Sequence, residues 1–165
     1  MKPRPATISP FLWFNDQAEA AAKFYVSLFK NSKIETVTRY SADSAGPGGR
    51  PGGSVMTVAF RLAGQKFTAL NGGPRFKFTE AISLVVSCRT QAEIDFFWDR
   101  LARGGEKSRC GWLKDRYGLS WQIVPDILGD LLGDRDEGKS GRALQAMLKM
   151  NKLDIKALKR AHAGK

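Results

Sequence analysis

Polar side chains that could hold a small molecule occur among aromatic residues in the segment Cys110–Pro125. The segment reads as two apolar strands joined at Asp115–Gly118, where Gly118 suits a three-residue hairpin loop ending in a left-handed residue. That register pairs Asp115 with Leu119. Alternation along each strand then places six side chains on one sheet face: Cys110, Trp112, Lys114, Ser120, Gln122 and Val124. An apolar face with a few polar groups is how a small-molecule pocket is lined, although an ordinary hairpin with one solvated face has the same pattern.

The candidate catalytic residues are Cys110 and Glu80. Cys110 would be a nucleophile if Lys107 and Arg109 lowered the pKa of its thiol, but Arg109 is expected on the opposite face of the strand. The only histidine, His162, lies near the C-terminus, so a Cys–His pair is excluded and a buried, inert thiol is the alternative. Glu80 is expected at the start of a strand, where it could act as a base or be an ordinary exposed acid.

Seven side chains from several predicted strands and loops form the expected ligand site: Trp13, Asn71, Phe76, Phe78, Trp112, Lys114 and Gln122. The aromatic rings would provide an apolar lining, and the amides and the ammonium would orient a polar ligand. Lys114 favours an anionic or oxygen-rich ligand, unless its stem only covers apolar surface while its ammonium reaches water. Trp121 alternates to the opposite face and is assigned to the core.

The composition is that of a globular protein. The chain has 165 residues, 42% of them hydrophobic, which is enough for one domain with a real core. No apolar run approaches the roughly 20 residues that span a bilayer, and Met1–Pro10 lacks the apolar core of a signal peptide. Two cysteines are too few for a disulfide scaffold, so we expect a cytoplasmic protein, with Cys88 in the core.

The net charge of +11 is concentrated in residues 138–165, which carry eight basic residues against the single acid Asp154. A basic segment can bind polyanions through phosphate contacts and counterion release. This one also has apolar residues at roughly helical spacing: Leu144, Met147, Leu148, Leu153, Ile155 and Leu158. The spacing favours two amphipathic helices packed on the body or on a partner subunit, and makes nucleic acid an improbable partner.

The remaining elements follow from periodicity and punctuation. Strands are expected at 8–14, 34–40, 55–62, 65–70 and 81–88, the last buried on both faces because it is nearly all apolar. Asp16–Glu19 and Thr90–Glu93 resemble capping boxes, which would begin helices ending near Phe29 and Gly104. Residues 41–53 contain five Gly and two Pro, and would form either a lid or a plain flexible connection.

An internal repeat organises these elements. Gln17-Ala18-Glu19 recurs 74 residues later at Gln91-Ala92-Glu93, and Phe24-Tyr25 recurs 73 residues later at Phe97-Trp98. Each copy follows a strand and precedes further strands. The sequence therefore predicts two βαβββ units.

Two βαβββ units are the build of the vicinal oxygen chelate superfamily, and the chain resembles its PhnB-like branch, often labelled 3-demethylubiquinone-9 3-methyltransferase. The resemblance covers essentially the whole chain and is carried by short motifs: Thr7–Phe14, Phe24-Tyr25 with Phe29, Ala69–Pro74, Phe76–Ser83, Cys110–Asp115 and Gly118–Pro125. It implies an α+β fold of two βαβββ modules forming curled mixed sheets, with a C-terminal helical tail. Residues 1–137 would be the paired domain, with module one over about 7–72 and module two over about 78–125, and residues 138–165 the basic tail.

The resemblance also implies where a metal would bind. Metal-using relatives hold a divalent ion with inward His and Glu side chains, and the position of the last Glu is Gln122 here. A neutral amide is a poor substitute for an anionic ligand, and no His-and-carboxylate set is evident, so we expect no metal and no other cofactor. The motif Asn71-Gly72-Gly73-Pro74 lacks the strand-to-helix context of a nucleotide-binding glycine loop, so it does not indicate S-adenosylmethionine.

Three functions remain open at this level. The first is a metal-independent small-molecule binding protein, as a homodimer without membrane contact. The second is an enzyme on the same fold, with an all-oxygen metal site or Cys110 chemistry. The third is a polyanion-binding protein acting through the basic segment.

Overall fold

The computed structural model describes residues 7–42 and 49–165. The chain divides into two compact units, residues 1–77 and 78–165, and each unit is described by itself. None of the helices within the described ranges is long and apolar enough to cross a membrane.

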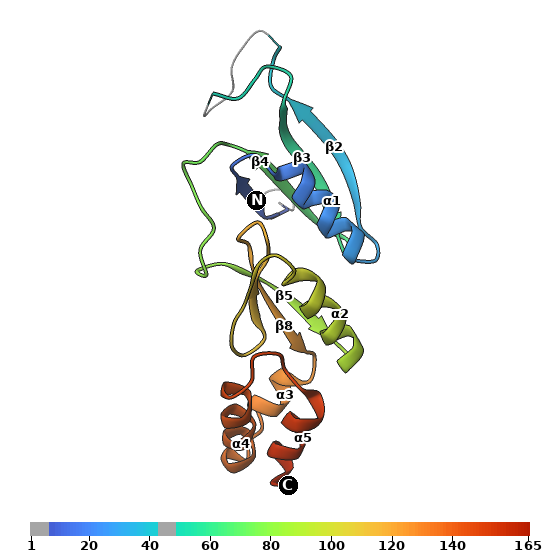
Figure 1. Ribbon diagram of the computed structural model, residues 1–165. Coiled ribbons are helices and arrows are strands. Elements are labelled where there is room, and N and C mark those ends of the chain that lie inside the picture. The colour runs from blue at the N-terminus through green and yellow to red at the C-terminus, as the bar shows by residue number, and fades with distance from the viewer. Residues whose placement is uncertain (1–6, 43–48) are drawn as a thin grey trace, which may run out of the picture. The chain divides into compact units, whose positions relative to one another are not determined.

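The first unit contains one βαβββ module, which we call module one (Figure 1). Its elements are β1 (Phe11–Phe14), α1 (Ala18–Leu28), β2 (Lys33–Arg39), β3 (Val55–Leu62) and β4 (Gln65–Asn71). The strand order is β1-β4-β3-β2, with β1 parallel to β4 and the other neighbours antiparallel.

The second unit begins with a module of the same kind, module two. Its elements are β5 (Ser83–Cys88), α2 (Gln91–Leu101), β6 (Glu106–Lys107), β7 (Trp112–Lys114) and β8 (Ser120–Pro125). The order β5-β8-β7-β6 repeats that of module one, again with one parallel pair, between β5 and β8. The predicted α+β fold of two βαβββ modules is confirmed.

The positions of α1 and α2 show which of the two internal repeats, at 73 or at 74 residues, marks equivalent positions in the two modules. Both ends of α2 lie 73 residues after the corresponding ends of α1. Tyr25 and Trp98, which are 73 residues apart, are both buried. The aromatic repeat is therefore in register, whereas the Gln-Ala-Glu repeat, at 74 residues, is displaced by one position and does not mark equivalent sites.

The core of module one forms where α1 packs on β3 and β4. Phe60 lies between two rings, with centroids 6.4 Å from Tyr25 and 5.4 Å from Phe67. The predicted capping box at Asp16 is wrong: α1 has no side-chain cap, and the Ala18 N–H donates instead to the Asn71 carboxamide oxygen, at 2.8 Å. Only β4, from the far end of the module, provides that acceptor.

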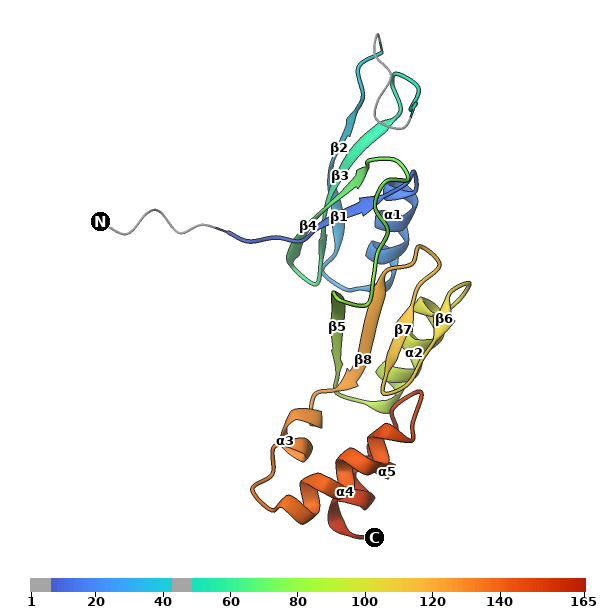
Figure 2. The same cartoon turned by 90° about the vertical axis from the view of Figure 1, so that its left-hand side faces the viewer.

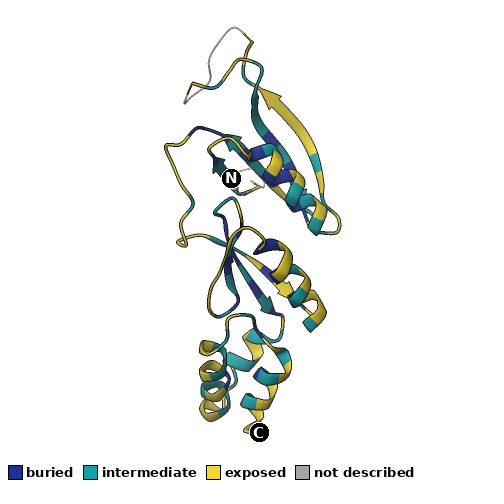
Figure 3. Cartoon of the chain, viewed as in Figure 1, coloured by how far each residue is buried: buried dark blue, intermediate teal, exposed yellow. Residues whose placement is uncertain are grey.

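Module two buries one face of its sheet under α2. The Thr90–Glu93 capping box is confirmed, with reciprocal bonds between the two side chains and the backbone. The prediction that the strand at 81–88 is buried on both faces is wrong, because Val85 is 57% exposed and Ser87 is also exposed. β5 is an edge strand covered on one side only, and its residues alternate between exposed and buried from Val85 to Cys88 (burial is coloured in Figure 3).

The glycine-rich segment 41–53 is described only at its ends, since residues 43–48 lie outside the described residues. At the described ends, the backbone of Tyr40 pairs with that of Gly53 and Ser54. This pairing extends the β2–β3 ladder beyond the strands themselves. The choice between a lid and a plain connection stays a prediction.

Three helices follow module two and are called the helical tail: α3 (Leu128–Leu132), α4 (Glu137–Leu148) and α5 (Ile155–Ala163). Two of them match the predicted amphipathic pair, and α3 was not predicted. Of the apolar residues expected to pack, Leu153 and Leu158 are fully buried, whereas Leu144 and Leu148 are 40% and 46% exposed.

The helical tail is fastened to module two, beyond one end of its sheet (Figure 2). The Gln91 carboxamide donates to the Leu153 carbonyl at 3.1 Å and accepts from the Ile155 N–H at 3.0 Å. Lys152 also pairs with Asp95 at 2.7 Å. The basic segment is therefore held against α2 of module two by hydrogen bonds and an ion pair within the same chain.

Candidate functional site

The β7–β8 hairpin is held by the buried carboxylate of Asp115. One of its oxygens accepts from the backbone N–H groups of Tyr117 (2.8 Å) and Leu119 (3.1 Å), and the other accepts from the Trp121 indole N–H at 2.9 Å. Gly118 has φ +85, the left-handed conformation expected at the end of the loop. The predicted pairing of Asp115 with Leu119 is confirmed by their backbone hydrogen bond.

The hairpin register gives the sheet a covered and an open face. Trp112 pairs with Gln122 and Lys114 with Ser120, as predicted. The alternate residues are buried on the α2 side: Leu113, Trp121 and Ile123 are at most 2% exposed. Trp112, Lys114 and Gln122 are only half-buried, so their side chains line the open face.

Cys110 does not take the place that the sequence predicted. β7 begins at Trp112, and Cys110 precedes it with φ +57 in a turn, not opposite Val124 in the ladder. The segment between α4 and α5, residues 149–154, which we call the tail connection, accounts for this change. The N–H groups of Cys110 and Gly111 donate to its Met150 and Asn151 carbonyls at 2.8 and 2.7 Å. The thiol donates to the Met147 carbonyl at 3.6 Å, and Cys110 lies outside the pocket described next.

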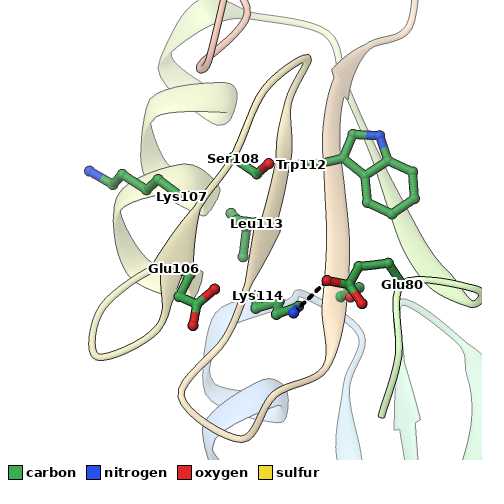
Figure 4. A pocket seen from close by; sticks show the side chains of 8 residues that line it. Glu80, Glu106, Lys107, Ser108, Trp112, Leu113 and Lys114 are labelled. Carbon is green, nitrogen blue, oxygen red and sulfur yellow. Dashed lines mark ion pairs between the residues drawn. The ribbon is translucent and has the colours of Figure 1, made fainter.

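A pocket of about 390 Å³ opens at the end of this hairpin (Figure 4). Its lining includes Glu80, Glu106, Ser108, Trp112, Lys114 and Ser120. They come from the segment before β5 and from β6, β7 and β8 with their connections. The pocket thus combines one indole with side chains of both charges and two hydroxyls.

Lys114 and Glu80 form the main charged contact of the pocket. The Lys114 ammonium lies 2.5 Å from the Glu80 carboxylate, and Figure 4 shows the two side chains pointing toward each other. This hydrogen bond holds the pKa of the Glu80 carboxyl below its usual value and raises the pKa of the Lys114 ammonium. Both groups stay ionised near neutral pH, and a lowered pKa makes Glu80 a weaker base.

Ser120 adds a polar atom without a partner. Its hydroxyl oxygen is buried and has no hydrogen-bond partner in the structure, although Ser120 lines the pocket and sits opposite Lys114 in the ladder. Buried hydroxyls are normally hydrogen-bonded, so this oxygen can still take a hydrogen-bond partner, such as a water molecule or a group that enters the pocket. The sequence placed Ser120 on the open face without assigning it a role.

The other predicted ligand residues of module two lie around this pocket. The Gln122 carboxamide is on the open face and donates to the Ser83 hydroxyl at 2.9 Å. Phe78 is half-buried in the segment before β5, two residues from Glu80. Neither residue is part of the pocket lining. Glu106 and Ser108 were missed because a strand of two residues, β6, leaves no periodic signal.

Trp13, Asn71 and Phe76 belong to the first unit, the first two within module one and Phe76 after β4. The Trp13 indole N–H donates to the Gly73 carbonyl at 2.9 Å, and its ring meets Phe76 edge-on at 4.9 Å. Phe76 is 54% exposed. Asn71 is buried, and its carboxamide bonds to the Ala18 N–H and the Val55 carbonyl, which gives it a structural role. That these three residues share a ligand site with Trp112, Lys114 and Gln122 stays a prediction.

Comparison with known proteins shows to which family the chain belongs. The sequence profile of the 3-demethylubiquinone-9 3-methyltransferase family matches residues 6–124. The chain belongs to this family. It is a PhnB-like member of the vicinal oxygen chelate superfamily. No curated protein gives a significant match.

Solved structures of similar proteins share the fold, and one of them also supports the family membership. A PhnB protein from Bacillus cereus, provisionally named a 3-demethylubiquinone-9 3-methyltransferase, shares 36% identity over 73% of this chain and 99% of its own, with a TM-score of 0.66. Protein PA1353 from Pseudomonas aeruginosa shares 20% identity over 74% and 100%, with a TM-score of 0.59. The fosfomycin resistance protein FosX from Listeria monocytogenes, complexed with Mn(II) and sulfate, shares 14% over 78% and 95%, with a TM-score of 0.52. The last two show the fold alone.

The side chains of this PhnB-like protein do not fit the His-and-carboxylate metal site of the superfamily. Within residues 7–42 and 49–165, no three His, Cys, Asp or Glu side chains are close enough together to hold an ion. The pocket on the open face of module two has an indole, the Lys114 ammonium and two carboxylates, of which Glu80 is paired with that ammonium and Glu106 is the other. Beside it lies the Gln122 carboxamide, whose nitrogen points to Ser83. An ammonium repels a cation, and a single amide is a weak ligand for one.

Proposed function

We propose that this protein binds a small organic molecule in the module-two pocket without using a metal ion. The observation that carries the proposal is the combination of an indole, a lysine and a buried, unpartnered serine hydroxyl in one pocket of about 390 Å³. Small-molecule sites are typically about 300–1,000 Å³, with apolar walls and a few polar groups that orient the ligand. The family name does not by itself indicate methyl transfer by this chain.

The test is a ligand-observed NMR screen of small carboxylates, alcohols and amines, both aromatic and aliphatic, with the whole chain. Trp112→Ala removes the indole of the pocket. Phe96→Ala is the matched control, because it removes an exposed ring from α2, outside the pocket. We expect compounds that bind the wild type and Phe96→Ala but bind Trp112→Ala at least tenfold more weakly. If every binder is indifferent to Trp112→Ala, the pocket is not the site.

The metal-independent part of the proposal has its own measurement. Elemental analysis of the purified protein should show no stoichiometric divalent ion, and added Mn²⁺ or Zn²⁺ should leave the affinity of the screened compounds unchanged. One tightly held ion per chain would overturn this part and would favour the enzyme hypothesis with an oxygen-ligand site.

A homodimer in the cytoplasm is part of the same proposal. The edge strand β5 and the residue before it expose apolar side chains, Val85 at 57% and Ile82 at 74%, and both cysteines are unpaired thiols. A second copy would cover this strand, because exposed apolar edges favour association. Sedimentation equilibrium should give a dimer for the wild type and a monomer for Val85→Glu. Gln145→Glu, at an exposed position of α4 and not on β5, is the control for charge alone. A wild-type monomer would refute the dimer.

A further inference from the structure

The Glu80–Lys114 ion pair lies in the lining of the module-two pocket. Glu80 comes from the segment before β5, not from the sheet, and its side chain is 62% exposed. Its carboxylate reaches the ammonium of Lys114, whose side chain is 33% exposed. The other lysine of the pocket, Lys107, points away from Lys114 and lies 3.9 Å from Asp99 (Figure 4).

The hydroxyl of Ser120 provides the second, independent observation. Ser120 is the direct ladder partner of Lys114, and side chains of such partners begin about 4.5–5.5 Å apart. Its oxygen is buried and unpartnered, although the residue lines the pocket. A carboxylate has two oxygens that accept hydrogen bonds, so one bound carboxylate can accept from both the ammonium and the hydroxyl. In the structure, the carboxylate of Glu80 satisfies only the ammonium.

We propose that the pocket takes a ligand with a carboxylate group, which docks on Lys114 and Ser120, and that Glu80 is an internal competitor for this position. This inference rests on the proposed small-molecule function and adds the class of ligand. On binding, the ligand replaces Glu80 at the ammonium, and the Glu80 carboxylate returns to water. The remainder of the ligand lies along the Trp112 ring.

The exposure of the Glu80–Lys114 pair determines how strongly Glu80 weakens the binding of an anion. Exposed ion pairs are weak, because water and salt screen them and because two long side chains must be held in place. Removing such a competitor therefore strengthens binding of an anion by about two- to fivefold. It leaves the binding of an uncharged molecule of the same shape unchanged.

The experiment uses acetate as the smallest carboxylate and acetamide as its uncharged isostere. Each is titrated at constant ionic strength into the full chain, and the backbone amide signals of Lys114 and Ser120 are followed by NMR. Glu80→Gln and Glu80→Ala remove the competitor. Glu106→Gln is the matched control, since it removes the same charge from the same pocket without uncovering Lys114. Lys114→Met removes the proposed binding group.

We expect both Glu80 variants to bind acetate about two- to fivefold more tightly than the wild type. Glu106→Gln should have a smaller effect, Lys114→Met should abolish saturable acetate shifts, and acetamide should not distinguish the variants. Equal acetate affinity in Glu80→Ala and Glu106→Gln would overturn the inference, as would acetate shifts that survive Lys114→Met. Either result leaves the Trp112-dependent screen, and with it the proposed function, unaffected.

Discussion

Asn71 offers the sharpest test of how module one is held together. Its buried carboxamide accepts from the Ala18 N–H at 2.8 Å and donates to the Val55 carbonyl at 3.0 Å. It thereby joins the start of α1, the start of β3 and the end of β4. Asn71→Ala leaves the buried Ala18 N–H without a partner, at a cost of about 1–3 kcal/mol, and loses a partly buried bond worth about 0.5–1.5 kcal/mol. We expect a loss of roughly 2–4 kcal/mol in the free energy of unfolding.

Urea denaturation followed by circular dichroism measures this loss, and amide hydrogen exchange at Ala18 locates it. Asn151→Ala is the matched control, because Asn151 is exposed and its backbone carbonyl, not its side chain, accepts from Gly111. The Ala18 amide should exchange faster in Asn71→Ala and at the wild-type rate in the control. A change in unfolding free energy of less than about 0.5 kcal/mol for Asn71→Ala would refute the structural role and leave Asn71 available as a ligand residue.

Two further predictions concern a buried thiol and a close backbone contact. Burial raises the pKa of the Cys88 thiol to about 11, so about one thiol in a thousand is the reactive thiolate at pH 8. Mass spectrometry should find Cys88 unmodified by iodoacetamide at pH 8 and increasingly modified as the pH approaches 11; labelling at pH 8 as fast as in urea would contradict this. A Cβ added at Gly72 would lie 2.2 Å from a ring carbon of Trp13, so Gly72→Ala should destabilise the protein by about 1–3 kcal/mol in thermal unfolding. Gly141→Ala, within α4 and facing open space, should instead stabilise it by about 0.5–1 kcal/mol; the same sign for both would refute the contact argument.

The sequence alone determined the features that depend on neighbours along the chain. Alternation around Gly118 was enough to predict the β7–β8 register, and the spacing from Thr90 to Glu93 was enough for the cap of α2. The aromatic repeat predicted the two modules, because each copy needs the same buried ring at the same point of its helix. These signals are local, or repeated at a fixed period, so they survive without knowledge of the fold.

Only the tertiary structure decided contacts between residues far apart in the chain. The Ala18 N–H is satisfied from 53 residues away, so Asp16 was a plausible but unused cap. The tail connection captures the backbone of Cys110 and turns it out of the ladder. Sequence reasoning placed both Glu80 and Lys114 near a pocket but could not pair them, because an ion pair between separate segments leaves no pattern in the sequence. The fold brings the two charges together, so that the Lys114 ammonium in the pocket is already paired with the Glu80 carboxylate.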